Sequence, residues 1–129
     1  MNLTCVVVTP EATALEATAE FIALPLYDGE IGIASNHSAM IGRLGYGELR
    51  LRTGSSVQRY YLDGGFVQVA DNVVSVLTER AVAVDDLDRA EAEQQLDEAL
   101  NLPASNPDQQ ETKQRRIEQA RAVLRVARR

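Results

Sequence analysis

The sequence has no tryptophan, one cysteine and one histidine among its 129 residues. The single cysteine, Cys5, excludes an internal disulfide and a zinc site built from several cysteines. Because Cys5 lies in the apolar run Leu3–Val8, we expect it to be a small buried hydrophobic residue. With only one histidine as well, the ligands that a metal site needs are missing.

Long apolar runs are also missing. No stretch approaches the roughly 18 apolar residues that a membrane-spanning helix requires, and the N-terminus lacks the basic and apolar regions of a signal peptide. The net charge is −6, and so acidic a chain is a poor match for nucleic acid, which binds basic surfaces. These features predict a soluble cytoplasmic protein that neither enters the membrane nor binds nucleic acid.

Residues 1–84 have the patterns of short strands. Glu48–Arg52 alternates strictly between polar and apolar residues, as a strand with one wet face does. Leu15–Leu24 alternates loosely and is expected to form one strand that ends at Pro25. Turn-forming residues recur every 8–12 positions, which predicts an antiparallel β-sandwich or barrel. The expected turns lie at Gly45–Gly47, Thr53–Ser56, Asp63–Gly65 and Asp71–Asn72.

The pattern becomes helical after Val84. A first helix is expected over residues 85–101, with Asp88 and Glu91 arranged as a capping box. Asn106 and Pro107 have the cap chemistry of a second helix start, and this helix has a narrow apolar stripe formed by Ile117, Ala120, Leu124 and Ala127. The sequence therefore predicts a β-sandwich domain, residues 1–84, followed by an antiparallel two-helix hairpin, residues 85–129.

The candidate site lies in the stretch Tyr27–His37. Glu30 and His37 flank a short predicted strand, and the loop before His37 is polar. No nucleophilic serine or cysteine accompanies these residues in a recognisable motif, so catalysis is improbable. The remaining interpretations are contact with a partner, or two solvated loop residues with no particular partner.

Three passages together resemble the epsilon subunit of bacterial F-type ATP synthases. They are Leu24-Pro25 leading through Gly29-Glu30-Ile31-Gly32-Ile33 to His37, then Gly45-Tyr46-Gly47-Glu48-Leu49-Arg50, then Gly64–Val69 with Asn72–Leu77 and Glu79-Arg80-Ala81. They occur in the family's order and cover most of residues 1–84. The sequence differs from the family pattern at Ala34-Ser35-Asn36, where a proline and a glycine are common, and at Ala39, which stands at a common proline.

The resemblance implies a non-catalytic subunit of an ATP synthase that couples rotation of the membrane c-ring to the central shaft. The implied partners are the gamma subunit, the polar loops of the c-ring and, when the tail extends, the catalytic beta subunits. Glu30 and His37 match the family's positions near the c-ring. The implied location is the cytoplasmic face of the inner or plasma membrane, as a peripheral part of the complex.

The tail has two candidate sites, each with a simpler alternative. Asp86 and Arg89 resemble the family's nucleotide-sensing motif, which implies a regulatory ATP as the only candidate ligand; alternatively they cap the helix and pair at i, i+3. The basic residues Arg115, Arg116, Arg121 and Arg125 either pair with Asp97, Glu98 and their neighbours in the folded hairpin or bind acidic beta-subunit loops to inhibit ATP hydrolysis.

One function of a different class competes with the rotor role. The chain could be a stand-alone β-sandwich that binds a small ligand or a peptide and dimerises through its helices. A tight complex with a larger helical shaft protein would favour the first function, and a self-sufficient monomer or homodimer the second.

Overall fold

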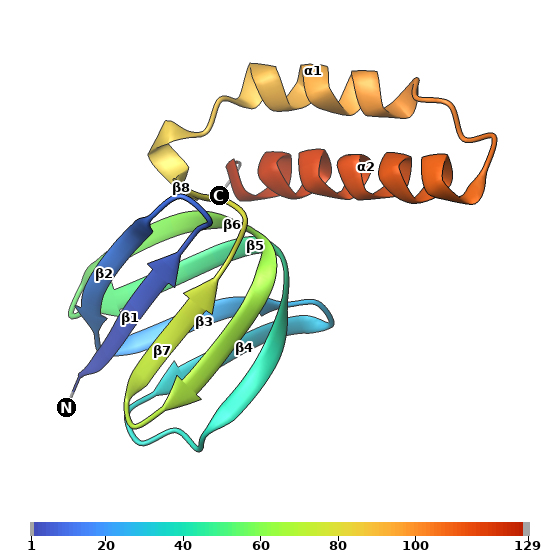
Figure 1. The fold of residues 1–129 in the computed structure, drawn as a ribbon. Helices are drawn as coiled ribbons and strands as arrows, with labels where there is room; N and C mark the ends of the chain where they lie inside the picture. The colour runs from blue at the N-terminus through green and yellow to red at the C-terminus, as the bar shows by residue number, and fades with distance from the viewer. Residues whose placement is uncertain (1, 128–129) are drawn as a thin grey trace. The chain divides into compact units, whose positions relative to one another are not determined.

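A computed structural model describes residues 2–127, and the chain divides into two compact units, Met1–Ala83 and Val84–Arg129. The first is a β-sandwich and the second contains two helices packed on each other, so the predicted fold class is confirmed (Figure 1). The strands are β1 (Leu3–Val8), β2 (Thr13–Ala19), β3 (Phe21–Leu26), β4 (Gly29–Ala34), β5 (Met40–Thr53), β6 (Ser56–Ala70), β7 (Val73–Leu77) and β8 (Ala81–Ala83).

The strands form one hydrogen-bonded path that folds into two layers. Their order is β2-β1-β7-β6-β5-β3-β4, and β8 pairs with β6. Every pairing is antiparallel except that of β1 with β7, which is parallel. The sequence predicted an antiparallel sandwich throughout. The exception arises because five strands separate β1 from β7 along the chain, so no hairpin fixes their relative direction.

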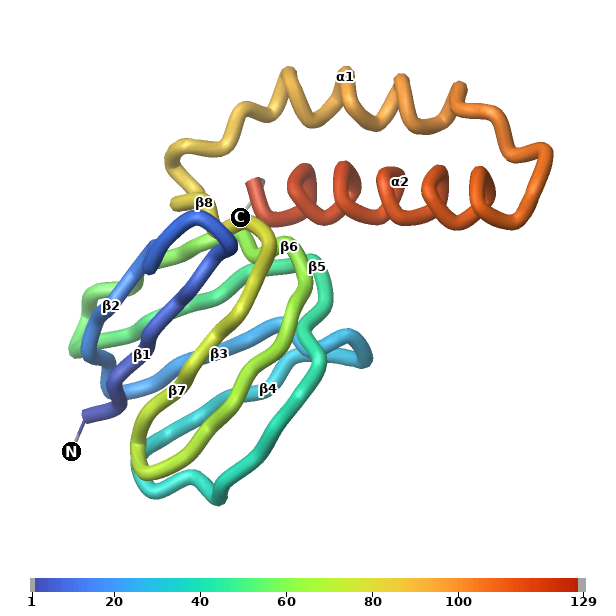
Figure 2. The backbone as a smooth tube through the Cα atoms, in the orientation of Figure 1, coloured from blue at the N-terminus to red at the C-terminus, as the bar shows by residue number. Residues whose placement is uncertain are grey.

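The turns predicted at Gly45–Gly47 and Asp63–Gly65 are wrong, because both segments lie inside long strands. β5 and β6 run unbroken as the two arms of one long hairpin (Figure 2). Residues Tyr60–Leu62 of β6 pair with β8, and residues Phe66–Ala70 pair with β7. The positive φ of Gly64 and Gly65 bends β6 between these two pairings. Glycine permits both a turn and a bend, so the sequence alone does not separate them.

The single strand predicted over Leu15–Leu24 is also wrong, because β2 ends at Ala19 and β3 begins at Phe21. β2 pairs with β1, whereas β3 pairs with β4 and β5, so the chain changes layers at Glu20. The Glu20 backbone N–H donates to the Arg52 carbonyl at 2.8 Å, and its carboxylate accepts from the Gly54 N–H at 3.1 Å. β3 continues through Pro25 to Leu26 instead of ending before the proline.

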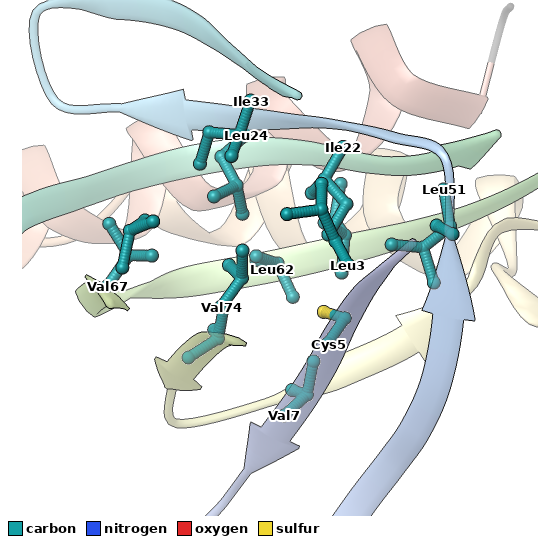
Figure 3. Close-up of a cluster of buried hydrophobic side chains, with 14 of the residues drawn as sticks. Leu3, Cys5, Val7, Ile22, Leu24, Ile33, Leu51, Leu62, Val67 and Val74 are labelled. Atoms are coloured by element: carbon teal, nitrogen blue, oxygen red, sulfur yellow. The ribbon is translucent and has the colours of Figure 1, made fainter. Parts of the chain in front are cut away.

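Aliphatic side chains fill the space between the layers (Figure 3). From β1 and β7 come Leu3, Cys5, Val7, Val74 and Val76, and from the opposite layer come Ile22, Leu24, Ile33, Leu49 and Leu51. Fully burying a side chain of this size stabilises a fold by about 1.5–3 kcal/mol. Cys5 is fully buried, as predicted, and burial raises the pKa of its thiol to about 12.

The second unit consists of the short 3₁₀ helix η1 (Val84–Asp86) and the helices α1 (Arg89–Leu100) and α2 (Pro107–Ala127). α1 begins later than predicted, because Asp88 has an extended backbone and acts as the N-cap. The Asp88 carboxylate accepts from the Glu91 N–H at 3.1 Å, and the Asn106 side chain accepts from the Gln109 N–H at 2.9 Å. Both predicted helix caps are therefore confirmed.

Apolar residues on α1 and α2 are small and few. α1 buries Ala92 and Ala99, and α2 buries the predicted Ile117, Ala120 and Leu124. The predicted stripe was incomplete, since α2 also buries Ala122, Val123 and Val126. At 100° per residue, Ala122 and Val126 lie on the opposite side of the helix from Ile117 and Leu124. α2 is therefore apolar on two sides.

Candidate interaction surface

The outer face of one sandwich layer carries exposed apolar side chains in register. Val8 on β1 pairs with Leu77 on β7, Leu77 pairs with Phe66 on β6, and Phe66 pairs with Arg43 on β5. Phe66 is 60% exposed and Leu77 is 59% exposed, whereas their neighbours Val67 and Val76 point into the core. We call the apolar row the half-buried Val8, the exposed Leu77 and Phe66, and the charged Arg43 that ends it. Directly opposed side chains lie about 5 Å apart, so the row is continuous.

A pocket of about 390 Å³ lies at the Val8 end of the apolar row. Its lining includes Val8, Pro10, Phe66 and Leu77, with Glu79 as its one charged side chain. Gly65 shapes this region, because a Cβ there would lie 1.8 Å from the Leu77 carbonyl oxygen. An apolar pocket beside exposed aromatic and aliphatic side chains is suited to receiving a side chain of a partner.

The apolar row is absent from the predictions made from sequence, although the sequence contains a signal for it. In Val73–Leu77 both faces of the strand have large apolar residues, Val74 and Val76 on one and Val73 and Leu77 on the other. A strand at the surface of a sandwich needs only one apolar face. The second apolar face therefore indicates a candidate interaction surface.

Glu30, a predicted site residue, lies near the start of the edge strand β4 and is held by Arg50. The Arg50 guanidinium donates to both Glu30 carboxylate oxygens, at 2.6 and 3.0 Å. It also donates to Glu48 at 3.3 Å, and Glu48 accepts from Arg59 at 2.6 and 2.9 Å. The hydrogen bond that Arg50 donates to Glu30 is the main reason that the pKa of Arg50 is raised. The four residues balance in charge, so Glu30 is not an isolated anion.

His37, the other predicted site residue, lies in the loop that follows β4. Its Nδ1 is 2.7 Å from the Ser38 carbonyl oxygen, so Nδ1 donates and Nε2 carries the lone pair when the ring is neutral. The preceding Asn36 has a positive φ, and its N–H donates to the Asn72 side chain at 2.6 Å. The loop therefore lies beside the β6–β7 turn (Figure 2), and His37 and Asp71 line one pocket.

Glu30 and His37 lie at opposite ends of β4. Glu30 pairs with Pro25 and Ala34 with Phe21, so the register places Glu30 and the loop after Ala34 at the two ends of the β3–β4 ladder. At about 3.3 Å per residue, Glu30 and Ala34 are roughly 13 Å apart. A partner that contacts both residues must span the whole strand.

The structure separates the two residues of the predicted nucleotide motif. Asp86 belongs to η1 and Arg89 begins α1, so the shared helical face that the motif requires is absent. The alternative, an ion pair between Asp86 and Arg89, is also wrong. Within residues 2–127 Arg89 pairs instead with Glu93, with its Nε 3.5 Å from the Glu93 Oε1. Nucleotide binding by these residues stays a prediction.

The basic residues predicted on the second helix all lie on α2, and Arg115, Arg116, Arg121 and Arg125 are exposed. The predicted pairing of this set with Asp97 and Glu98 is wrong for the first three, which make no ion pair within residues 2–127. Glu98 instead accepts a hydrogen bond from Gln94 on its own helix, at 3.3 Å. The helices pack through their apolar residues, and the three guanidinium groups face solvent.

Comparison with known proteins matches residues 2–84 to the family model "ATP synthase, Delta/Epsilon chain, beta-sandwich domain". An ATP synthase epsilon chain from Rhodopirellula baltica is 53% identical over 128 residues, covering 99% of this chain and 100% of the relative. An ATP synthase epsilon chain from Synechococcus is 34% identical over 129 residues, covering 98% of this chain and 94% of the relative.

Two solved structures have the same fold. A chain in the Euglena gracilis mitochondrial ATP synthase, resolved with OSCP, F1 and the c-ring, matches with a TM-score of 0.86 at 21% identity over 99% of this chain and 82% of that one. A chain in the central stalk and c-ring of the Tetrahymena thermophila mitochondrial ATP synthase matches with a TM-score of 0.71 at 18% identity over 98% of this chain and 97% of that one. Within residues 2–127, neither α1 nor α2 has the length and apolar content of a transmembrane helix.

Proposed function

The chain belongs to the ATP synthase epsilon-chain family, and from this premise we propose that it is a non-catalytic central-stalk subunit that couples a rotating membrane ring to the gamma shaft. Residues 1–84 contact the shaft and the ring, and residues 85–129 form a regulatory tail. The subunit is a peripheral part of a membrane-associated complex and performs no chemistry itself.

The apolar row is the observation that carries this proposal. A rotor subunit must hold its shaft through many turnovers, and stable interfaces have apolar cores with aromatic anchors. Phe66 and Leu77 are large, exposed and directly paired across β6 and β7, so they are suited to be those anchors. The gamma subunit binds this face.

Ring contact uses the two ends of β4. Glu30 is fixed by Arg50 in a balanced ion-pair network, and His37 is fixed by a loop tied to the β6–β7 turn. Fixed polar groups at both ends of a strand are suited to meeting the polar loops of a ring. Rigid placement also matters mechanically, because a coupling surface that yields under load transmits less torque.

The tail acts as a brake on ATP hydrolysis when it extends. Arg115, Arg116 and Arg121 are exposed and make no ion pair within residues 2–127, so their charges are available to acidic loops of the beta subunits. Extension opens the seam between α1 and α2, to which α1 contributes only the small buried residues Ala92 and Ala99. Both states can therefore be populated, as a switch requires.

The test is co-purification with the gamma subunit. We expect the unmodified chain to form a tight complex and the double variant Phe66→Ser, Leu77→Ser to lose it. Val57→Ser is the matched control, because Val57 is also on β6 and 49% exposed but lies at the far end of the strand. Retained binding by the double variant would show that the shaft docks elsewhere.

The stand-alone binding domain predicts a different result in the same experiment. The chain would then purify as a monomer or homodimer and ignore the gamma subunit. Light scattering of the chain alone and mixed with gamma separates the two functions.

A further inference from the structure

The apolar row ends in a charged residue whose guanidinium lies on an aromatic ring. Arg43 is exposed and pairs across the strands with Phe66. Its Cζ lies 5.6 Å from the centre of the Tyr27 ring, and Tyr27 is 67% exposed. Arg43 makes no ion pair within residues 2–127. By contrast, Arg50, also on β5, and Arg59, on the neighbouring β6, each bind a carboxylate.

The backbone fixes this stacked pair. The Tyr27 N–H donates to the Arg43 carbonyl oxygen at 3.0 Å, which holds the β3–β4 hairpin against β5. A guanidinium held in a cation–π contact still has N–H groups open to a ligand, and their fork matches a carboxylate with two parallel hydrogen bonds. Tyrosine and arginine are also among the residues most enriched in interface hot spots.

We propose that Arg43, held on Tyr27, is a carboxylate-binding anchor at the end of the apolar row. The occupant of this face is a shaft segment that places an acidic side chain beside apolar ones. The inference rests on the proposed function, which supplies the shaft as the partner, and adds the chemistry of the segment that docks. Apolar side chains of the shaft segment cover Phe66 and Leu77, and its acidic side chain accepts hydrogen bonds from the Arg43 guanidinium.

The test measures the dissociation constant of the gamma subunit for the full chain and its variants at several salt concentrations. Arg43→Gln removes the charge but keeps a polar side chain, and we expect it to weaken binding at least tenfold, as loss of a hydrogen-bonded interface charge does. We also expect it to flatten the dependence of affinity on salt. Arg43→Lys should recover only part of the loss, because lysine lacks the planar fork.

A matched control exists in the same domain. Arg52 is also exposed and stacked, with its Cζ 5.5 Å from the centre of the Phe21 ring, but it pairs with β3 and not with the apolar row. Arg52→Gln should leave the affinity for gamma unchanged. Equal weakening by both variants would mean general charge attraction and overturn the assignment of Arg43.

The outcomes separate this inference from the proposed function. If Phe66→Ser with Leu77→Ser abolishes binding while Arg43→Gln binds normally, the face is right and the anchor is wrong. If the Phe66 and Leu77 double variant still binds, the proposed face itself fails. Thermal melts of each variant confirm that the sandwich is intact, since neither arginine contributes to the core.

Discussion

Gly65 is the position where one added methyl group should cost the most stability. A Cβ there would lie 1.8 Å from the Leu77 carbonyl oxygen and 2.8 Å from its carbon. These are backbone atoms of the neighbouring strand, so no side-chain rotation relieves the contact. The φ of Gly65 is also +109°, where an alanine is strained by about 1–3 kcal/mol before any clash is counted.

We expect Gly65→Ala to destabilise the sandwich by about 3 kcal/mol or more, since β6 and β7 must separate to admit the methyl group. For a domain of this size each kcal/mol lowers Tm by about 4–8 °C. A fall of roughly 12–24 °C follows, measured as the loss of β-type circular dichroism on heating.

Gly54→Ala is the matched control, because Gly54 also has a positive φ, +60°, but a Cβ there meets nothing within 4 Å. It should cost only the strain of the left-handed backbone, about 1–2 kcal/mol. Equal melting temperatures for the two variants would refute the close approach of β6 to β7, and with it the account of how Gly65 shapes the apolar row.

Four further predictions follow from the two units and the site. A chain ending at residue 84 should melt cooperatively with β-type circular dichroism, and an aggregating fragment would contradict independent folding. Glu30→Ala with His37→Ala should leave the assembled complex intact but reduce ion-driven ATP synthesis; loss of gamma binding would mean that β4 faces the shaft. Removing Asn106–Arg129 should raise ATP hydrolysis by the complex, and unchanged hydrolysis would mean that the tail does not inhibit. Folding raises the pKa of Cys5 from 9.0 to about 12, so stability measured by urea unfolding should be constant with respect to this group below pH 9 and fall between pH 9 and 12, less steeply in Cys5→Ala.

The sequence predicted the strands well where one face alone is apolar. Glu48–Arg52 alternates strictly and lies within β5 as expected, and the turn at Asp71–Asn72 joins β6 to β7. The predicted wet face is wrong at Glu48, which is only 4% exposed and pairs with Arg50 and Arg59. Alternation reports which face of a strand is buried, and this is a local property. The helix caps at Asp88 and Asn106 were predictable for the same reason, since a cap depends on residues only three positions apart.

Features set by distant strands could not be predicted. Gly45 approaches the Leu26 carbonyl and Gly65 the Leu77 carbonyl, and neither neighbour is close in sequence. The same glycines would serve a turn, so the pattern permitted the wrong interpretation. The pairing of Glu30 with Arg50 joins residues twenty positions apart across an intervening strand, and no local pattern indicates it.

The tail shows how charge asymmetry in a sequence can suggest the wrong attraction. One arginine against eight acidic residues over 85–110, followed by seven basic residues over 111–129, suggested two helices held together by ion pairs. The structure pairs Arg89 with Glu93 within α1 and leaves Arg115, Arg116 and Arg121 without an ion pair in residues 2–127. Exposed ion pairs are worth about 0–1 kcal/mol, so the hairpin forgoes little where these three arginines make none. Under the proposed brake, opening the seam breaks no ion pair of these three arginines, so an acidic partner that only the extended helix can reach gains their charges with no ion pair lost, and this difference favours the extended state.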